Sequence, residues 1–350
     1  MIHQIGITYD LRSDYLAMGF TEEAVAEFDS DRTLEALHGT LLDLGYEVER
    51  IGHVRNLVRA LAEGRTWDLV FNIAEGIGGR CREAQVPAIL EAYGIPYTFA
   101  DPLICALTLD KAFAKRVVAA AGLNTPRHIV GSSWNELEDH NLLYPLFVKP
   151  NEEGTGKGID SRSRVDTPED YRALCLELLD RSLAPILVEE FLPGREFTTA
   201  VLGTGNRALA LGTMEVTILN PENRGIYSYE TKENCDELVR YTRLEDGPLK
   251  DDLQALALAA YRVLECRDAG RVDLRLDRLG KPSFIEVNPL AGLMPGHSDL
   301  PMIAGWEGVS YPELIRRIIE SASERCAPGR LTEPRLAGLT DQTPSSGATL

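Results

Sequence analysis

Three features that would place the chain in particular protein classes are missing from its sequence. The six cysteines among its 350 residues form no C-x-x-C pair, which argues against a zinc site or a disulfide scaffold and favours reduced thiols. Residues 1–10 lack the basic region of a secretion signal, and no apolar run reaches the roughly 18 residues of a membrane span. We therefore expect a soluble, cytoplasmic, globular protein.

Positive charge is also scarce. The sequence has 36 Lys and Arg against 54 Asp and Glu, which gives a formal net charge of −18, and no basic block occurs along the chain. This balance argues against nucleic acid or an anionic membrane surface as a partner, but it leaves room for a local cationic pocket that binds phosphate. We expect small-molecule partners.

Short apolar runs alternate with helical patterns over the first hundred residues. Strands are expected at residues 5–9, 46–51, 68–73 and 95–99, and helices near 34–45, 54–61 and 84–93. The first helix has an apolar stripe of Leu34, Leu37, Leu41 and Leu42 and ends at Gly45. The alternation predicts an N-terminal α/β domain with a parallel sheet at residues 1–102.

The remainder of the chain is typical of an α+β fold. Helices are expected at 109–121, 167–182, 249–266 and 310–324, and strands at 145–149, 186–192, 196–202, 208–216, 271–277 and 283–288. We predict a central lobe at 103–187 with a glycine-rich loop and a C-terminal lobe at 188–326. Residues 327–350, rich in Pro, Thr, Ser and Gly, are predicted to be a disordered tail.

The hairpin at residues 271–288 separates polar from apolar side chains. One face is expected to carry Val272, Leu274, Leu276, Ile285 and Val287, and the other Arg271, Asp273, Arg275, Glu286 and Asn288. A turn near Gly280 places Asp273 opposite Glu286, and facing carboxylates repel unless a cation lies between them. Such oxygen ligands suit Mg²⁺. The alternative is a solvated polar face that Arg271 neutralises.

Lys149 ends an apolar strand and precedes a loop, residues 151–158, with three glycines in five residues. Glycines such as Gly154 and Gly156 let backbone amides approach a polyphosphate, and a lysine adds charge. The loop does not fit a Walker motif, because its first glycine is missing and Gly158 stands where Ser or Thr is needed. The alternative interpretation is a plain turn.

Lys111 is expected in the first turn of a helix capped by Thr108. A cation there opposes the helix dipole unless both together hold an anion. The alternative is a surface lysine paired with Asp110.

Two further features have weaker signals. The run Gly76-Ile77-Gly78-Gly79-Arg80-Cys81 nearly fits a dinucleotide fingerprint, but Cys81 replaces the third glycine. His38 lies on the apolar stripe of its helix and is interpreted as packing. His297, shortly after the hairpin, is the better functional candidate.

In order, these pieces resemble the ATP-grasp enzymes and, among them, the D-alanine-D-alanine ligase family. The resemblance extends from about Trp67 to Ala322. It is carried by residues 95–98 (IPYT), 107–111 (LTLDK), 147–150 (FVKP), 194–198 (GREFT), 229–232 (YETK), 270–273 (GRVD) and 285–288 (IEVN).

The resemblance implies a role for most of these residues. Lys111 and Lys149, with Gly154 and Gly156, would contact the phosphates of ATP; Glu189, Glu190 and Leu192 would line the adenine slot, and Glu196 would reach the ribose. Lys232 would contact the transferred phosphate, and Arg271 would stabilise the oxyanion. Asp273, Glu286 and Asn288 would hold Mg²⁺, or Mn²⁺ in its place. Thr155 stands for a serine of the family's loop, and the pair His297-Ser298 is retained with a shift of one residue relative to the hairpin. The resemblance assigns these three residues to the catalytic site.

The implied reaction joins a carboxylate to an amine. The carboxylate attacks the γ-phosphate of ATP, and the amine then attacks the acylphosphate to give an amide, ADP and phosphate. The resemblance also implies a possible homodimer as an open alternative to a monomer.

The sequence departs from the family where the first amino acid is held. Glu75 replaces a histidine, Arg80 and Cys81 replace an acidic pair, and Glu233 replaces a tyrosine. Asp29 is the best match for the family's N-terminal glutamate, or else a helix cap. D-alanine and a different pair of substrates therefore both stay open. Two other classes are alternatives: a nicotinamide-dependent oxidoreductase using the loop at Gly76, and a nucleotide-binding protein without catalysis.

Overall fold

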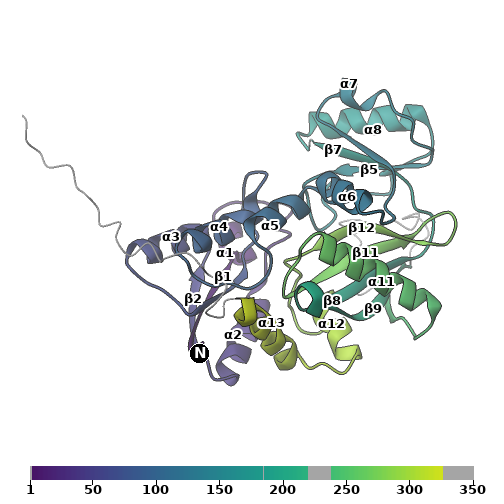
Figure 1. Ribbon diagram of the computed structural model, residues 1–350. Coiled ribbons are helices and arrows are strands. Elements are labelled where there is room, and N and C mark those ends of the chain that lie inside the picture. Colours follow the sequence, from purple (N-terminus) through teal and green to yellow (C-terminus); the bar gives the residue numbers. More distant parts are fainter. Residues whose placement is uncertain (1, 184, 220–237, 326–350) are drawn as a thin grey trace, which may run out of the picture.

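The computed structural model describes residues 2–183, 185–219 and 238–325 of the chain. Its elements form three sheets with covering helices, and Figure 1 shows one sheet in each of three regions that follow one another along the chain. The predicted disordered tail and Lys232 lie outside the described residues.

The N-terminal region is built on the predicted parallel sheet. Its strands are β1 (Gln4–Tyr9), β2 (Glu47–Gly52) and β3 (Leu69–Ile73), in the order β2-β1-β3. Its helices are α1 (Arg12–Ala17), α2 (Asp31–Asp43), α3 (Val54–Ala62) and α4 (Gln85–Ala92). Side chains of α2 pack on one face of the sheet, and those of α3 and α4 pack on the other.

Two expectations for this region were wrong in detail. Residues 95–99 do not extend the sheet as a strand, because only Tyr97 bridges to Val70. Leu42 does not belong to the buried stripe of α2: it is 49% exposed, whereas Leu37 and Leu41 are fully buried. The helix turns Leu42 past the edge of the face that meets the sheet.

The central region holds an antiparallel sheet in the order β4-β7-β5-β6. Its elements are β4 (His128–Gly131), α7 (Trp134–Leu137), β5 (Leu146–Pro150), β6 (Arg164–Val165), α8 (Pro168–Asp180) and β7 (Ile186–Glu190). The Thr167 side chain caps α8 by accepting from the amide of Asp170. β7 crosses the boundary predicted at 187/188, so the change of lobe comes after Glu190.

The C-terminal region is a five-stranded antiparallel sheet in the order β10-β9-β8-β11-β12. Its strands are β8 (Glu196–Leu202), β9 (Leu209–Ile218), β10 (Val239–Arg243), β11 (Ala269–Leu276) and β12 (Pro282–Asn288). The helices α11 (Pro248–Val263), α5 (Pro102–Leu109) and α6 (Lys111–Ala120) pack on one face. The helices α12 (Asp299–Trp306) and α13 (Tyr311–Arg325) pack on the other, and the Ser310 hydroxyl accepts from the amide of Glu313 at the start of α13.

The single helix expected at residues 109–121 is two helices. Asp110 adopts an extended backbone conformation between them and serves as the N-cap of α6. Both helices pack against β12 and α11, although the sequence placed them in the central lobe. Helix α5 was not predicted from the sequence, although Asp101 followed by Pro102 signals its start.

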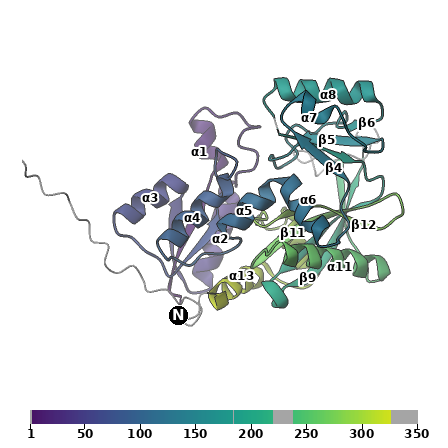
Figure 2. The ribbon, with the colours of Figure 1, turned by 45° about the horizontal axis from the view of Figure 1, so that its top comes forward.

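One apolar core joins the N-terminal and C-terminal sheets. It contains Leu37 of α2, Phe71 of β3, Met214 of β9 and Ile315 of α13, all fully buried. The central region stands apart above this body in Figures 1 and 2. Polar groups that face the junction of all three regions can therefore form a cleft.

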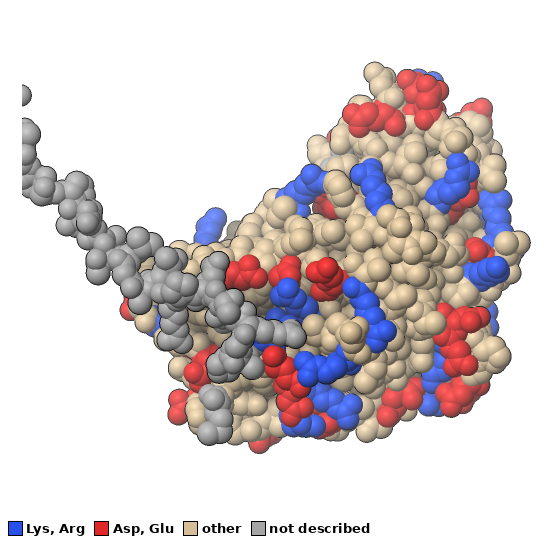
Figure 3. All heavy atoms as spheres, in the orientation of Figure 1, with Lys and Arg blue, Asp and Glu red and all other residues tan. Residues whose placement is uncertain are grey.

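The surface carries both charges. On the face drawn in Figure 3, acidic and basic side chains are interspersed over all regions. Within the described residues, no helix combines the length and the apolarity needed to cross a membrane.

Candidate active site

The polar face of the predicted hairpin lies at the junction of the three regions. Asp273 of β11 is directly opposite Glu286 of β12, and Arg271 is opposite Asn288. Residues opposite each other in an antiparallel pair point to the same side, so the four side chains form one polar group. The predicted pairing of Asp273 with Glu286 is confirmed.

A β-bulge corrects the prediction for the apolar face. The register shifts after Asp273, so that Leu274 faces Phe284, and both are fully buried. Ile285 was assigned to the apolar core, but the bulge turns it to the polar side, where it lines a cavity.

The carboxylates of the hairpin already have cationic neighbours. An oxygen of Asp273 accepts from the Thr198 hydroxyl at 2.8 Å, and Arg271 lies 3.1 Å from the carboxylate of Asp273. The Nζ atom of Lys111 lies 3.6 Å from Glu286. These contacts show that positive charge is favourable on both sides of the carboxylate pair.

The donor set fits Mg²⁺. Asp273 and Glu286 supply carboxylate oxygens, and Asn288 supplies a carboxamide oxygen on the same face. Within the described residues, no group of three His, Cys, Asp or Glu side chains could hold a metal alone. An ion at this hairpin would therefore need further oxygens, such as those of a phosphate.

Lys111 is more deeply buried than a surface lysine. It is 8% exposed, and its Nζ donates to the carbonyl of Glu153 at 2.7 Å. The predicted cap was wrong: Asp110 caps α6 by accepting from the amide of Phe113, while Thr108 lies inside α5. The alternative, a pairing of Lys111 with Asp110, was also wrong, because Asp110 forms its ion pair with Arg80, at 2.7 Å.

Two buried lysines share one glutamate beneath the glycine-rich loop. Glu189 of β7 lies 3.2 Å from the Nζ of Lys149 and 3.0 Å from the Nζ of Lys115. Lys115 was not identified from the sequence, although it follows Lys111 by four residues and therefore lies on the same helix face. The three side chains carry a formal net charge of +1 inside the fold, which suits a polyphosphate.

The pKa values of this group follow from burial and mutual attraction. Burial alone would raise the pKa of Glu189, but the charges of Lys115 and Lys149 outweigh it and bring the pKa to about 2. Burial lowers the pKa of Lys115 to about 8, against the attraction of Glu189. Burial acts in the same direction on Lys149, but Glu189 and Glu286 reverse it, so its pKa is raised.

The glycine-rich loop is bound to the N-terminal region. The amide of Gly154 donates to Glu27 at 2.5 Å, and Arg82 donates to the carbonyl of Glu152 at 3.1 Å. Gly156 has a φ of 77°, a left-handed conformation in which glycine is unstrained. The loop therefore lies between two regions, and a change at Glu27 affects its position.

A cavity of about 90 Å³ lies between the central and C-terminal sheets. All eight residues that the sequence assigned to the nucleotide line it: Lys111, Lys149, Gly154, Gly156, Glu189, Glu190, Leu192 and Glu196. Asp273 and Glu286 line the same cavity. The structure thus brings together the predicted phosphate ligands and the predicted metal ligands.

The apolar walls of this cavity were not identified from the sequence. They include Phe147, Ile159, Phe191 and Ile285, which provide flat and branched apolar surface for a base. Phe147 could have been found, because it precedes Lys149 by two residues and so shares its face of β5.

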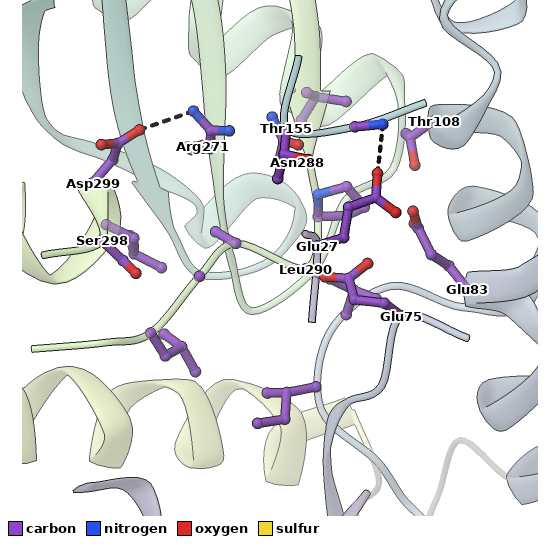
Figure 4. A pocket seen from close by; sticks show the side chains of 18 of the residues that line it. Glu27, Glu75, Glu83, Thr108, Thr155, Arg271, Asn288, Leu290, Ser298 and Asp299 are labelled. Carbon is purple, nitrogen blue, oxygen red and sulfur yellow. Dashed lines mark hydrogen bonds and ion pairs between the residues drawn. The ribbon is translucent and has the colours of Figure 1, made fainter. Parts of the chain in front are cut away.

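A second cavity of about 280 Å³ adjoins the first. Lys111, Gly154, Thr155 and Glu286 line both. The other predicted site residues at its wall are Arg271, Asn288, His297 and Ser298. Figure 4 shows Arg271 with Asp299 on one side of this cavity and Glu27, Glu75 and Glu83 on the other.

Acidic side chains of the N-terminal region line this second cavity. They are Glu27, Asp29, Glu75 and Glu83. Asp29 was the expected counterpart of the family's glutamate, but Glu27 is the carboxylate that reaches the glycine-rich loop. Glu27 and Asp29 both precede α2 and are two residues apart, so their positions in the sequence did not show which of them matches the family's glutamate.

These acids have raised pKa values. Burial raises the pKa of Asp29 to about 7, against a hydrogen bond from Thr33. Burial also raises the pKa of Glu83 to about 7, with Arg82 opposing, and raises that of Glu75, to which the charge of Glu83 adds.

The loop that resembled a dinucleotide fingerprint serves this cavity instead. The amide of Gly76 donates to buried Asp10 at 2.9 Å, and Glu75 before it lines the cavity. Cys81 is exposed. The loop therefore presents an acid to this cavity, whereas a dinucleotide fingerprint presents backbone amides to a phosphate.

Comparison with known proteins decides the family. A sequence model described as D-ala D-ala ligase C-terminus matches residues 118–320 of the chain. The chain belongs to the D-alanine-D-alanine ligase family. The D-alanine-D-alanine ligase of Bordetella pertussis is 36% identical over 294 residues, which cover 83% of this chain and 89% of that protein. The uncharacterized protein y4sG of Sinorhizobium fredii is 33% identical over 75% of this chain and 76% of its own length.

The fold agrees with that of solved members. The crystal structure of D-alanine-D-alanine ligase from Bacillus anthracis complexed with ATP matches with a TM-score of 0.70 and 22% identity, over 93% of this chain and 98% of that chain. The predicted ATP-grasp fold is confirmed. The family confirms the predicted enzyme class, an ATP-dependent carbon-nitrogen ligase that uses ATP and Mg²⁺.

Proposed function

We propose that this member of the family joins two amino acids by an amide bond, with ATP activating the carboxylate of the first. The observation that carries the proposal is the adjacency of the two cavities. Lys111 and Glu286 line the nucleotide cavity and the larger cavity at once, so a γ-phosphate and a carboxylate can meet between them. Such positioning supplies much of the acceleration in phosphoryl transfer.

The lysines orient ATP. Lys149 is held by Glu189, and Lys111 is held by the carbonyl of Glu153, so both lysines are fixed at the wall of the nucleotide cavity. Asp273, Glu286 and Asn288 would hold Mg²⁺, which neutralises charge on the transferring phosphoryl group.

Arg271 is placed for the second step. It lines the larger cavity beside Asn288, and its guanidinium group can stabilise the oxyanion that forms when the amine attacks. The glycine-rich loop, attached through Gly154 to Glu27, contributes Gly154 and Thr155 to the walls of both cavities, and in this position it would limit hydrolysis of the acylphosphate. Thr155, His297 and Ser298 are proposed to contact the amino acids, and Lys232 stays a prediction outside the described residues.

The relatives' names make D-alanine the first substrate to test. Purified protein with ATP and Mg²⁺ should release ADP only when amino acids are added, singly or in pairs, and the Glu286→Gln variant should not. ADP release that ignores every amino acid would contradict ligation and favour a nucleotide-binding protein without this chemistry.

Two finer expectations belong to this proposal. We propose that the enzyme works in the cytoplasm, where ATP and free amino acids are available, and cell fractionation tests this. A homodimer is proposed from the family resemblance, and light scattering at several protein concentrations tests it.

A further inference from the structure

One arginine organises the chain where the central sheet passes into the C-terminal sheet. Residues 191–195 connect β7 to β8. Phe191 and Leu192 of this connection line the nucleotide cavity. Glu196, at the start of β8, and Arg275 of β11 line it as well. The connection and its two charged neighbours therefore form part of the wall that faces a nucleotide.

The guanidinium group of Arg275 has three partners, and all of them lie between residues 191 and 196. Its Nε donates to the carbonyl of Gly194 at 3.0 Å, and its Nη1 donates to Oε2 of Glu196 at 3.0 Å. Its Cζ atom lies 5.0 Å from the centre of the Phe191 ring, within the range of a cation–π contact. One side chain therefore fixes the main chain, the carboxylate and the ring of this segment relative to one another.

The pairing of β11 with β8 brings these groups together. Arg275 lies directly opposite Glu196 in this antiparallel pair, so both side chains point to the same side of the sheet. Gly194 lies against the next residue of β11, Leu276, because a Cβ atom at this glycine would come within 2.5 Å of the Cβ atom of Leu276. Glycine thus lets the connection approach β11 closely enough for its carbonyl to meet the guanidinium group.

The ring of Phe191 is also held from the central sheet. The Cζ atom of Arg164 in β6 lies 4.8 Å from the centre of the same ring. The amide of Phe191 donates to the carbonyl of Pro145 at 3.0 Å. Two guanidinium groups, one from each sheet, therefore fix an aromatic surface of the cavity on which a base can stack.

Glu196 keeps one carboxylate oxygen for a ligand. Arg275 engages Oε2, whereas Oε1 accepts no hydrogen bond from any described residue. Oε1 is not among the buried polar atoms that lack a partner, so it retains accessible surface on a side chain that lines the cavity. An ionised carboxylate only accepts hydrogen bonds, so its partner in a ligand is a donor such as a hydroxyl group.

The lysine expected at the phosphates also attracts this carboxylate. Burial acts to lower the pKa of Lys149, and nearby carboxylates raise it. Glu196 is one of these carboxylates, after the stronger contributions of Glu189 and Glu286. The ion pair with Arg275 holds Glu196 in place against this attraction. A fixed acceptor that neighbours both a surface for the base and a cation for the phosphates suits the hydroxyl groups of a sugar.

We propose that Arg275 is a positioning residue that makes the nucleotide site selective for ribose over deoxyribose. By fixing Glu196 beside the ring of Phe191, it presents a carboxylate oxygen to the hydroxyl groups of a sugar whose base lies on that ring. This inference rests on the proposed function, because it assigns a specificity to the nucleotide cavity of the same enzyme. A role of Arg275 in folding alone would affect the binding of ribonucleotides and deoxyribonucleotides equally.

Nucleotides that lack one hydroxyl group isolate the contact. ADP, 2′-deoxy-ADP and 3′-deoxy-ADP are titrated into the full-length protein with Mg²⁺, and isothermal titration calorimetry measures each dissociation constant without turnover. For at least one of the two deoxy forms, we expect the wild type to bind ADP about tenfold or more tightly, since a hydrogen bond to a charged group contributes about this much.

Variants assign the preference to the arginine. Arg275→Met keeps a long side chain without the guanidinium group and should reduce the preference for ADP to about threefold or less. Glu196→Gln should have a similar effect, and combining the two changes should cause no further loss, because both residues act on one contact. Arg275→Lys retains a charge opposite Glu196 and should keep part of the preference. Arg207→Met, which breaks an exposed ion pair with Glu324, is the matched control and should keep all of it.

Thermal unfolding verifies that each variant is folded, and if Arg275→Met is not, a preference in Arg275→Lys equal to that of the wild type overturns the inference. Equal binding of all three nucleotides by the wild type would overturn it as well. So would a preference that survives in Arg275→Met, even with weaker binding of every nucleotide. Failure of the proposed function has a different signature, namely a preference for ADP over its deoxy forms without any release of ADP when ATP and amino acids are supplied.

Discussion

Asp273 lies directly opposite Glu286 across β11 and β12, and the two carboxylates share the wall of the nucleotide cavity. Removing one of the two carboxylates should abolish the metal site while the protein stays folded. In Glu286→Gln, we expect ADP release to fall by about 100-fold or more, since stabilisation of charge on the phosphoryl group is lost. The thermal stabilisation of the protein by Mg²⁺ with ATP should fall with it.

Glu245→Gln is the control for this change, because Glu245 is 85% exposed at the side chain and lies outside both cavities. Near-normal ADP release by Glu286→Gln at saturating Mg²⁺ would contradict the assignment of Glu286 to the metal.

Glu189 compensates two buried lysines, and its removal should be costly. Glu189→Gln leaves Lys115 and Lys149 close together with little compensation, and we expect a loss of about 3–5 kcal/mol in the free energy of unfolding. Adding Lys115→Met should recover part of that loss, because one uncompensated charge is removed. Urea unfolding of the single and double variants measures both effects. Equal stability of the Glu189→Gln variant and the double variant would contradict the pairing of Glu189 with both lysines.

Glu83 should make stability depend on pH. Its pKa rises from the usual 4.5 to about 7 in the fold, so the folded state binds more protons than the unfolded state between these values. The stabilisation is complete below about pH 4.5 and is lost as pH rises through 7. Relative to Glu83→Gln, the wild type should lose on the order of 1–2 kcal/mol between pH 5 and pH 7.5.

The comparison with the variant cancels the titrating groups that do not interact with Glu83, while Glu75, whose pKa the charge of Glu83 raises, contributes to the difference in the same direction. Unfolding by urea at the two pH values is sufficient, and Glu63→Gln, which is exposed, should follow the wild type. Parallel pH profiles for the wild type and Glu83→Gln would show that the carboxyl group of Glu83 titrates normally.

Glu27 should control the position of the glycine-rich loop. Glu27→Ala removes the acceptor for the amide of Gly154 and the partner of Arg82. We expect the KM for ATP to rise about tenfold and the fraction of ATP hydrolysed without amide formation to increase, since water reaches the acylphosphate. Glu23→Ala, whose exposed side chain lies 3.9 Å from Arg181, is the control. Unchanged coupling of ADP release to amide formation would contradict this role.

The sequence contained the regular features of the fold and of the nucleotide cavity. Alternation of apolar residues located β11 and β12, and their pairing placed Asp273 opposite Glu286. Lys149 and its glycine loop were recognised together because a charged residue at the end of a buried strand is unusual.

Other features depend on details that periodicity does not encode. A one-residue bulge moved Ile285 from the core to the cavity, and an extended residue at Asp110 divided one expected helix into two. Glu27 and Lys115 acquire their roles from contacts with Gly154 and Glu189, more than seventy residues away in the chain. Such long-range contacts require the folded structure.

The central claim is that the reaction proceeds through an acylphosphate, and transfer of ¹⁸O from the amino acid to phosphate tests it most directly. The amino acid that supports ADP release is supplied with ¹⁸O in its carboxylate, and the phosphate formed with ATP and Mg²⁺ is analysed by mass spectrometry. Because the carboxylate oxygen that attacks the γ-phosphate leaves with it, the account predicts one ¹⁸O atom in each phosphate released. Phosphate that carries only solvent oxygen and γ-phosphate oxygens would contradict it.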